Sequence, residues 1–178
     1  MRAAAPEAVL TRPRDLVLVG LTASGRSAIG FGVARRLGFS YTDTNALLEV
    51  HAERTADEIE RSSGHRALER AELQAARAAM SASSPVVYAC DPDILDLEPT
   101  ELDELFSTAC VVWLDPGVPD QDPDDSSGSI GPDSGALVHV SRLGSSRRRS
   151  AHRLSDVEIR VDRSSTTDQL IDEILMRR

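Results

Sequence analysis

The sequence predicts an α/β fold in which helices sandwich a five-stranded parallel sheet. Short apolar runs of strand length alternate with longer segments whose apolar residues recur at helical spacing, and strands that alternate with helices form parallel sheets covered on both faces. A glycine-containing loop at residues 20–25 lies between the first apolar run and the first helical segment. Folds of this class present backbone N–H groups to phosphates at that position.

Glycines bound the first strand and the first helix. Residues 16–19 form a short apolar run that ends at Gly20, which is typical of a buried strand. In residues 25–37 apolar side chains recur at helical spacing, and Gly38 ends the helix. The recurring side chains are Ile29, Val33, Ala34 and Leu37.

The middle of the chain continues the alternation. Residues 39–42 are predicted as a short second strand and residues 46–51 as a short helix. Thr55 and Glu58 have the spacing of a capping box, which predicts the start of a further short helix. Residues 67–80, rich in Ala, Leu, Glu and Arg, predict a helix most strongly.

The remaining elements follow the same rules. Three more apolar runs predict strands, and two further segments predict helices, the last of them amphipathic with a cap at Thr166 or Thr167. The strands are expected at residues 85–89, 110–114 and 157–161, and the helices at residues 100–106 and 167–176.

Length and composition indicate a single domain, residues 15–178, after a flexible N-terminus at residues 1–14. A chain of 178 residues suits one core. Within the domain, 18 of the 21 residues in 115–135 are Asp, Pro, Gly or Ser. Such a composition cannot bury a core, so a low-complexity, acidic, disordered loop is expected there.

The charge and the apolar pattern exclude several classes of protein. A formal net charge of −9 argues against a nucleic-acid binder, because phosphate backbones require a basic face. No apolar run has the length of a membrane span, and the N-terminus lacks the apolar stretch of a signal peptide. Cys90 and Cys110 lie far apart and are expected to be buried free thiols. A cytoplasmic location is therefore expected.

The loop at residues 20–27 matches a phosphate-binding loop with one substitution. Gly20, Gly25 and Ser27 fit the pattern G-x-x-x-x-G-K-[ST], but Arg26 stands in place of the lysine. All 20 basic residues of the chain are arginines, so this exchange follows the overall composition, although a guanidinium differs from an ammonium in size and donor geometry. The loop either cradles phosphate or forms a turn that packs the helix on the sheet. The predicted nucleotide-binding residues are Gly20, Ala23, Ser24, Gly25, Arg26, Ser27 and Ala28.

An ordered set of segments resembles the shikimate kinase family, small P-loop kinases of the nucleoside-monophosphate-kinase type. The segments cover nearly the whole chain: LVLVGLTASGRSAIG, ARRLGFSYTDTNALLE, TADEIERSSGHRALERAE, VVYAC, VVWLD and IRVD. The resemblance implies a shikimate-kinase-like P-loop fold, and ATP-dependent phosphorylation of a cyclic hydroxy acid with Mg²⁺.

On the phosphate side, the resemblance implies a metal site and a damaged catalytic pair. Ser27 matches the family's Mg²⁺-ligating hydroxyl, and Asp43 matches the first carboxylate of its Asp-x-Asp motif, which helps to hold Mg²⁺. Arg26 replaces the lysine that bridges the β- and γ-phosphates. Asn45 replaces the second carboxylate, the candidate base, and an amide cannot accept that proton at neutral pH. Arg26 and Asn45 are therefore predicted as degenerate catalytic residues.

On the substrate side, the sequence departs further from the family. Glu69 stands where the family has a substrate-binding arginine, and the family's Gly-Gly-Gly is replaced by Cys90-Asp91-Pro92. The acidic loop occupies the place of the lid. Counting back from Val161-Asp162 puts Arg149 at the second substrate arginine, or Arg147 with a slip of two residues. The predicted substrate-side residues are Asn45, Glu69, Asp91 and Arg149.

These departures predict a catalytically degenerate member, a pseudokinase with weak nucleotide or phosphate binding, for which ATP and Mg²⁺ are the expected cofactors. Its role would then be interaction or regulation, with a protein partner bound through the acidic loop or through the basic cluster Arg142, Arg147, Arg148, Arg149 and Arg153. The alternative is an active ATP-dependent kinase, either a shikimate kinase or a related polyol or cyclitol kinase. A structural remnant that binds nothing is the third hypothesis.

Overall fold

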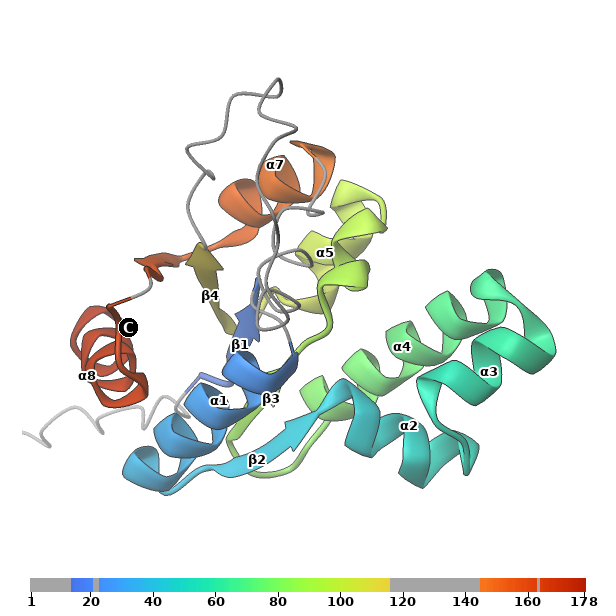
Figure 1. The fold of residues 1–178 in the computed structure, drawn as a ribbon, viewed down its shortest axis with the longest axis horizontal. Coiled ribbons are helices and arrows are strands. Elements are labelled where there is room, and N and C mark those ends of the chain that lie inside the picture. Colours follow the sequence, from blue (N-terminus) through green and yellow to red (C-terminus); the bar gives the residue numbers. More distant parts are fainter. Residues whose placement is uncertain (1–13, 21–22, 116–144, 163) are drawn as a thin grey trace, which may run out of the picture.

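The computed structural model describes residues 14–20, 23–115, 145–162 and 164–178, which Figure 1 draws in colour. Five strands form one sheet in the order β2-β3-β1-β4-β5, and every neighbouring pair is parallel. This confirms the five-stranded parallel sheet predicted from the sequence. The strands are β1 (Leu16–Val19), β2 (Ser40–Asp43), β3 (Val86–Ala89), β4 (Cys110–Asp115) and β5 (Val157–Arg160).

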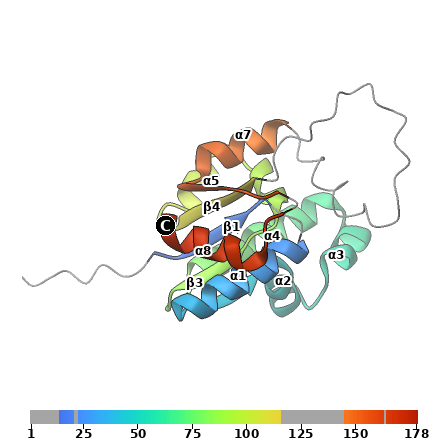
Figure 2. The ribbon, with the colours of Figure 1, turned by 60° about the vertical axis from the view of Figure 1, so that its left-hand side comes forward.

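Helices cover both faces of the sheet (Figure 2). The helices α1 and α8 pack on one face, and α4, η1, α5 and α7 pack on the other. Their bounds are α1 (Ala23–Leu37), α2 (Thr44–Ala52), α3 (Ala56–Ser63), α4 (His65–Met80), the 3₁₀ helix η1 (Pro92–Asp96), α5 (Pro99–Leu105), α7 (Ser145–Leu154) and α8 (Thr167–Arg177).

Strand β1 is the centre of the core because it is covered on both sides. Leu16 and Leu18 face α1 and α8, whereas Val17 and Val19 face the opposite helical layer. All four side chains are at most 1% exposed. A strand buried on both faces has no polar alternation, which explains the uninterrupted apolar run LVLV.

A separate small lobe is formed by α2, α3 and α4, at the right of Figure 1. Its apolar cluster contains Leu48 from α2, Ile59 from α3, and Leu68 and Ala75 from α4. Helix α4 belongs both to this lobe and to the layer on the sheet, since Ala76 and Ala79 pack against the sheet core. It therefore carries polar side chains from the lobe towards the carboxyl ends of the strands.

The predicted helix ends are largely confirmed by their caps. Both predicted caps form capping boxes, Thr55 with Glu58 before α3, and Thr166 with Gln169 before α8. Helix α2 starts at Thr44, two residues before its predicted start, because Asp43 caps it: Asp43 Oδ1 accepts a hydrogen bond from the Ala46 N–H at 2.9 Å.

Two elements were not predicted. The short η1 starts where Asp91 accepts a hydrogen bond from the Asp93 N–H and Pro92 occupies the first turn. Helix α7 has the polar sequence SSRRRSAHRL, in which Ala151 is buried in the core and Leu154 packs against it partly buried. Neither segment has the apolar periodicity on which a sequence-based helix prediction depends.

Other sequence predictions have mixed outcomes. Cys90 and Cys110 are buried free thiols, as predicted. In the described part of the chain, no helix has the length and apolar character needed to cross a membrane. Three predictions concern residues that the structure does not describe: the flexible N-terminus up to residue 13, residues 116–135 of the acidic loop, and the loss of the lid. They remain predictions.

Gly20 ends β1 where the chain has no room for a side chain. Its φ is +113°, and a Cβ built there would lie 2.6 Å from the Trp113 ring and 2.6 Å from the Leu114 carbonyl oxygen. Both β4 residues are fully buried, so neither can move aside. The first glycine of the loop is thus required by packing on β4, whatever the loop binds.

We expect Gly20→Ala to lower the free energy of unfolding by about 2–4 kcal/mol, from overpacking and from the positive φ. The matched control is Gly38→Ala, since Gly38 also has a positive φ (+68°) but has nothing within 4 Å of its Cβ position. Gly38→Ala should lower the free energy of unfolding by about 1 kcal/mol. Urea unfolding followed by the fluorescence of Trp113, the one tryptophan in the chain, measures both. Equal losses would show that packing on β4 contributes nothing.

Candidate functional site

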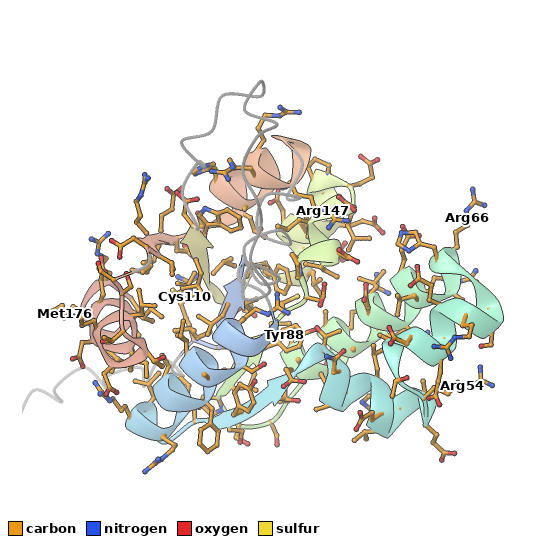
Figure 3. The ribbon with its side chains drawn as sticks, viewed as in Figure 1. Arg54, Arg66, Tyr88, Cys110, Arg147 and Met176 are labelled. Carbon is orange, nitrogen blue, oxygen red and sulfur yellow. The ribbon has the colours of Figure 1, made fainter. Side chains whose placement is uncertain are left out.

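The candidate site lies at the carboxyl ends of β1, β2 and β3. Parallel pairing of these strands brings the segments that follow them to one edge of the sheet. The loop and α1 follow β1, Asp43 ends β2, and Cys90-Asp91 follows β3. Figure 3 shows the side chains around this edge, with Tyr88 labelled near its centre and Arg147 above it.

The predicted nucleotide-binding residues lie around the start of α1. Gly20 ends β1, and α1 begins at Ala23 and includes Gly25. Ser27 is half-buried and Ala28 is exposed, so both lie near the surface of this edge. The side chains of Ala23 and Ser24 are not among those described.

Ser27 and Asp43, the two predicted Mg²⁺ ligands, are linked through Tyr41. The Tyr41 hydroxyl donates to Asp43 Oδ2 at 3.0 Å. Burial raises the pKa of Tyr41, and a hydrogen bond with Ser27 opposes that rise. Because Asp43 Oδ1 also caps α2, the carboxylate is held from two sides. The structure therefore brings the two predicted metal-binding side chains to the same corner.

Arg26, in the position of the phosphate-loop lysine, pairs with Asp91. Its Nη2 lies 3.4 Å from Asp91 Oδ2, and the Arg26 side chain is only 4% exposed. Asp91 lies between β3 and η1. The guanidinium charge is thus directed at a carboxylate of the protein, where a bound phosphate would otherwise compete for it.

A buried hydrogen-bond network joins the ends of β2 and β3. The Asp91 N–H donates to Thr44 Oγ1 at 2.9 Å, and Thr44 Oγ1 lies 2.8 Å from the Tyr88 hydroxyl. Thr44 is 3% exposed and Tyr88 is fully buried. Thr44 therefore fixes the backbone that presents Asp91, a role that the sequence did not indicate. By contrast, the predicted substrate residue Asn45 is exposed.

A cavity of about 220 Å³ lies between α4, η1 and the start of α5. Six of its eight lining residues are acidic, and the predicted substrate residue Glu69 is one of them. Glu69 also lies 3.4 Å from His65 Nε2 on the same helix. The lining residues are Glu69, Glu72, Asp93, Ile94, Asp96, Leu97, Glu98 and Glu101.

Glu72 is the most buried carboxyl group of this cavity. It is 6% exposed, and no hydrogen bond or ion pair joins it to another described residue. Burial raises the pKa of Glu72 from its ordinary value of 4.5 to about 8, and the charges of Asp91 and Asp93 add to the rise. Glu72 is therefore largely protonated at neutral pH when the cavity holds no cation.

Arg147 reaches the rim of the cavity from α7. Its Nη1 lies 2.5 Å from Asp93 Oδ1, and its Nε donates to Asp96 Oδ1 at 2.8 Å. These hydrogen bonds raise the pKa of Arg147 further above its ordinary range. Arg149, the residue predicted as the second substrate arginine, is exposed. Because an α-helix has about 3.6 residues per turn, Arg147 and Arg149 lie on different faces of α7.

Sequence comparison identifies the family. The family model described as "SKI: Shikimate kinase" matches residues 22–121. A shikimate kinase of Symbiobacterium thermophilum is 31% identical over 169 residues, which cover 90% of this chain and 94% of that protein. The chain belongs to the shikimate kinase family. This confirms the resemblance drawn from the sequence motifs.

Solved shikimate kinases share the fold. A structure of the Acinetobacter baumannii enzyme in complex with shikimate superposes with a TM-score of 0.71 at 18% identity, covering 92% of this chain and 91% of that one. A structure from Aquifex aeolicus gives a TM-score of 0.67 at 16% identity, covering 92% and 95%. At these identities the likeness establishes the fold alone.

The shikimate kinase family uses ATP with Mg²⁺. The corner formed by Ser27, Tyr41 and Asp43 fits a hard cation with oxygen ligands. Arg26 pairs with Asp91, and its charge also acts on Tyr41 in that corner. The matching family model, the Symbiobacterium thermophilum relative and the Acinetobacter baumannii structure are each named as shikimate kinase, so the comparisons support an ATP-dependent kinase more directly than the degenerate member predicted first.

Sequence reasoning missed Glu72 and Asp93 as site residues. Glu72 lies three residues after Glu69 on α4, so both can face the same side of the helix. Asp93 belongs to η1, which had no recognisable helical pattern. The density of acidic residues in 91–104 was a signal, but only the fold shows that α4 faces it.

The raised pKa of Glu72 makes a specific pH prediction for the metal-free protein. Between pH 4.5 and about 8 the folded chain retains a proton on Glu72 that the unfolded chain has lost, so this group lowers stability as the pH rises through that window. Glu72→Gln removes the effect. We expect the variant and the parent to have equal free energies of unfolding near pH 5. At pH 9 the free energy of unfolding of the variant should be higher by more than about 1.4 kcal/mol, the equivalent of one pKa unit.

Urea unfolding at both pH values, with EDTA present, measures this difference. The control is Glu101→Gln, which alters an exposed carboxyl group of the same cavity. It should leave the pH dependence of stability unchanged. A Glu72→Gln effect of the same size at pH 5 and pH 9 would contradict a raised pKa.

Proposed function

We propose that the chain is an ATP-dependent phosphotransferase of the shikimate kinase type whose acceptor is a hydroxylated small molecule without a carboxylate. The observation that carries this proposal is the corner in which Ser27 and Asp43 meet through Tyr41. This arrangement supports a retained Mg²⁺–nucleotide site next to the loop. Family membership supports the reaction class.

The residues of this corner would hold the metal ion and the nucleotide. Ser27 and Asp43 supply oxygen ligands for Mg²⁺, which neutralises the phosphate charge during transfer. Loop N–H groups at the start of α1 hold the phosphates, helped by the helix dipole. Arg26 exchanges Asp91 for phosphate oxygens when the nucleotide enters, since both are anions within the reach of one guanidinium.

The loss of the base at Asn45 is compatible with transfer. The transition state of phosphoryl transfer is loose, so positioning and charge stabilisation supply most of the catalysis. Asn45 is exposed at the start of α2. An amide there can orient a hydroxyl group by hydrogen bonding without accepting its proton.

The carboxylates of the cavity decide which acceptor is excluded. Glu69, Glu72 and Asp93 line it, and the substrate arginine of the family is replaced by Glu69. At neutral pH, where Glu72 is protonated, a carboxylate acceptor such as shikimate would still meet the negative charges of Glu69 and Asp93 in a partly desolvated space, which costs several kcal/mol. Neutral polyols and cyclitols meet no such repulsion and can donate hydrogen bonds to the carboxylates.

The ion pair between Arg26 and Asp91 favours a second candidate function. If that pair persists when nucleotide binds, the γ-phosphate lacks its cation, and the chain binds nucleotide without transferring phosphate. This second candidate is the degenerate member predicted from the sequence. It differs from the first in turnover, not in nucleotide binding.

Nucleotide binding is tested by calorimetry with Mg-ATP. We expect a dissociation constant below about 100 µM, which corresponds to about 5.5 kcal/mol of binding free energy. Asp43→Asn should weaken binding about tenfold, because it removes a metal-binding charge while asparagine still caps α2. Asp57→Asn, an exposed carboxylate in the first turn of α3, is the matched control and should leave the affinity unchanged. No detectable heat up to 1 mM ATP would exclude both functions.

Turnover is tested by coupled ADP release with a panel of acceptors. Neutral polyols and cyclitols should stimulate ADP release at least about tenfold more than shikimate, a difference of about 1.4 kcal/mol in transition-state free energy. This activity should be lost in Asp43→Asn. Preferential turnover of shikimate would refute the charge argument. ATP binding without turnover of any acceptor would establish the second candidate.

A further inference from the structure

Two carboxyl groups that line the acidic cavity, those of Glu72 and Asp93, lie close to a third, that of Asp91. Glu72 on α4, Asp91 before η1 and Asp93 within η1 each place one oxygen within 4.8 Å of the other two. Glu72 is buried, and the two aspartates are half-buried. Oxygens bound to one Ca²⁺ at about 2.3–2.6 Å lie up to about 5 Å apart, so this spacing suits one shared cation.

Glu72 gives independent evidence that a partner belongs here. It is 6% exposed, lines the cavity, and has neither a hydrogen bond nor an ion pair with another described residue. Buried polar groups are almost always hydrogen-bonded, because an unsatisfied one costs free energy. A carboxyl group that is nine-tenths buried and faces a cavity without a partner indicates a ligand that donates protons or carries positive charge.

The two aspartates are only partly neutralised by arginines. Arg26 lies 3.4 Å from Asp91 Oδ2, and Arg147 Nη1 lies 2.5 Å from Asp93 Oδ1. Each aspartate is thus paired through one oxygen. The other oxygen of Asp91 accepts a hydrogen bond from the Asp93 N–H at 3.2 Å, which holds the two carboxylates close together.

The remaining charges of the cavity strengthen the preference for a cation. Four more carboxylates line it, and Arg147 also pairs with one of them, Asp96. The additional carboxylates are Glu69, Asp96, Glu98 and Glu101. Such a field concentrates cations and repels anions, even where individual carboxylates are paired.

We propose that Glu72, Asp91 and Asp93 bind one divalent cation that prefers oxygen ligands, such as Mn²⁺ or Ca²⁺. Three carboxylates and no nitrogen or sulfur ligand select hard cations. This site shares no residue with the corner formed by Ser27, Tyr41 and Asp43. It therefore does not rest on the proposed phosphotransferase function.

A cation here would change the character of the cavity. The family arginine is replaced by Glu69, one helical turn from Glu72. A divalent ion held by Glu72 would restore positive charge close to the place where that arginine would stand. Its open coordination positions could accept hydroxyl oxygens of a small molecule, as Ca²⁺ and Mn²⁺ readily do.

The test is calorimetric titration of the nucleotide-free full chain, stripped with EDTA and then dialysed, with MnCl₂ and separately with CaCl₂ at pH 8. We expect one saturable site per chain for at least one of the two ions. Glu72→Gln, which is isosteric, should weaken binding at least tenfold. Glu101→Gln, at the same cavity but outside the triad, should change the affinity less than twofold. Asp43→Asn should leave this affinity unchanged.

A second measurement separates loss of binding from loss of fold. The metal ion should raise the unfolding temperature of the parent and of Glu101→Gln by a few degrees at ten times the dissociation constant, but not that of Glu72→Gln. No saturable binding of either ion up to 1 mM would overturn the proposal. Equal losses in Glu72→Gln and Glu101→Gln, or loss of binding in Asp43→Asn alone, would also overturn it.

Discussion

The parallel pairing of β1 with β3 and β4 is the constraint on which the rest of the molecule depends. With β1 in the centre of the sheet, the loop after β1 opens beside the segment that follows β3. The pairing of β2 with β3 brings Asp43 to the same edge. Gly20 permits this arrangement because Trp113 on β4 occupies the space that a side chain would need. The packing of Gly20 on Trp113 therefore also determines where the candidate site forms at the end of β1.

The charged side chains at this edge of the sheet largely neutralise one another in ion pairs between arginine and aspartate. Asp91 follows β3, and Arg26, in the lysine position of the phosphate-loop pattern, pairs with it. Arg147 reaches the cavity and is shared by Asp93 and Asp96. Arginine suits both tasks, because its planar fork can bridge two carboxylates where an ammonium offers a point charge. The charges of Arg26 and Arg147 are thus used in ion pairs inside the protein, whereas Glu72 forms no ion pair with a described residue and only the charge of Arg147 opposes the rise of its pKa.

The fold was accessible from the sequence to a greater extent than the site. Strands such as LVLV were recognisable because they are buried on both faces, and α3 and α8 because their caps have a local signature. Asp43 and Ser27 were predicted as metal ligands because they match two motifs of the family that the sequence resembles. Thr44, Glu72 and Asp93 were not, since their roles arise from partners on other elements. Helix α7 escaped prediction because its sequence is polar and its position depends on ion pairs with other elements.

The sequence by itself determined the alternation of strands and helices, the parallel sheet, the capped helix starts and the phosphate-loop pattern with its arginine. These features are written in local periodicity and in short fixed spacings, which a chain carries before it folds. Only the tertiary structure decided that Arg26 faces Asp91, that Arg147 and not Arg149 reaches the cavity, and that six acidic residues line one cavity. The physical reason is that charge pairing and burial depend on distances between elements, and those distances exist only after the sheet has assembled.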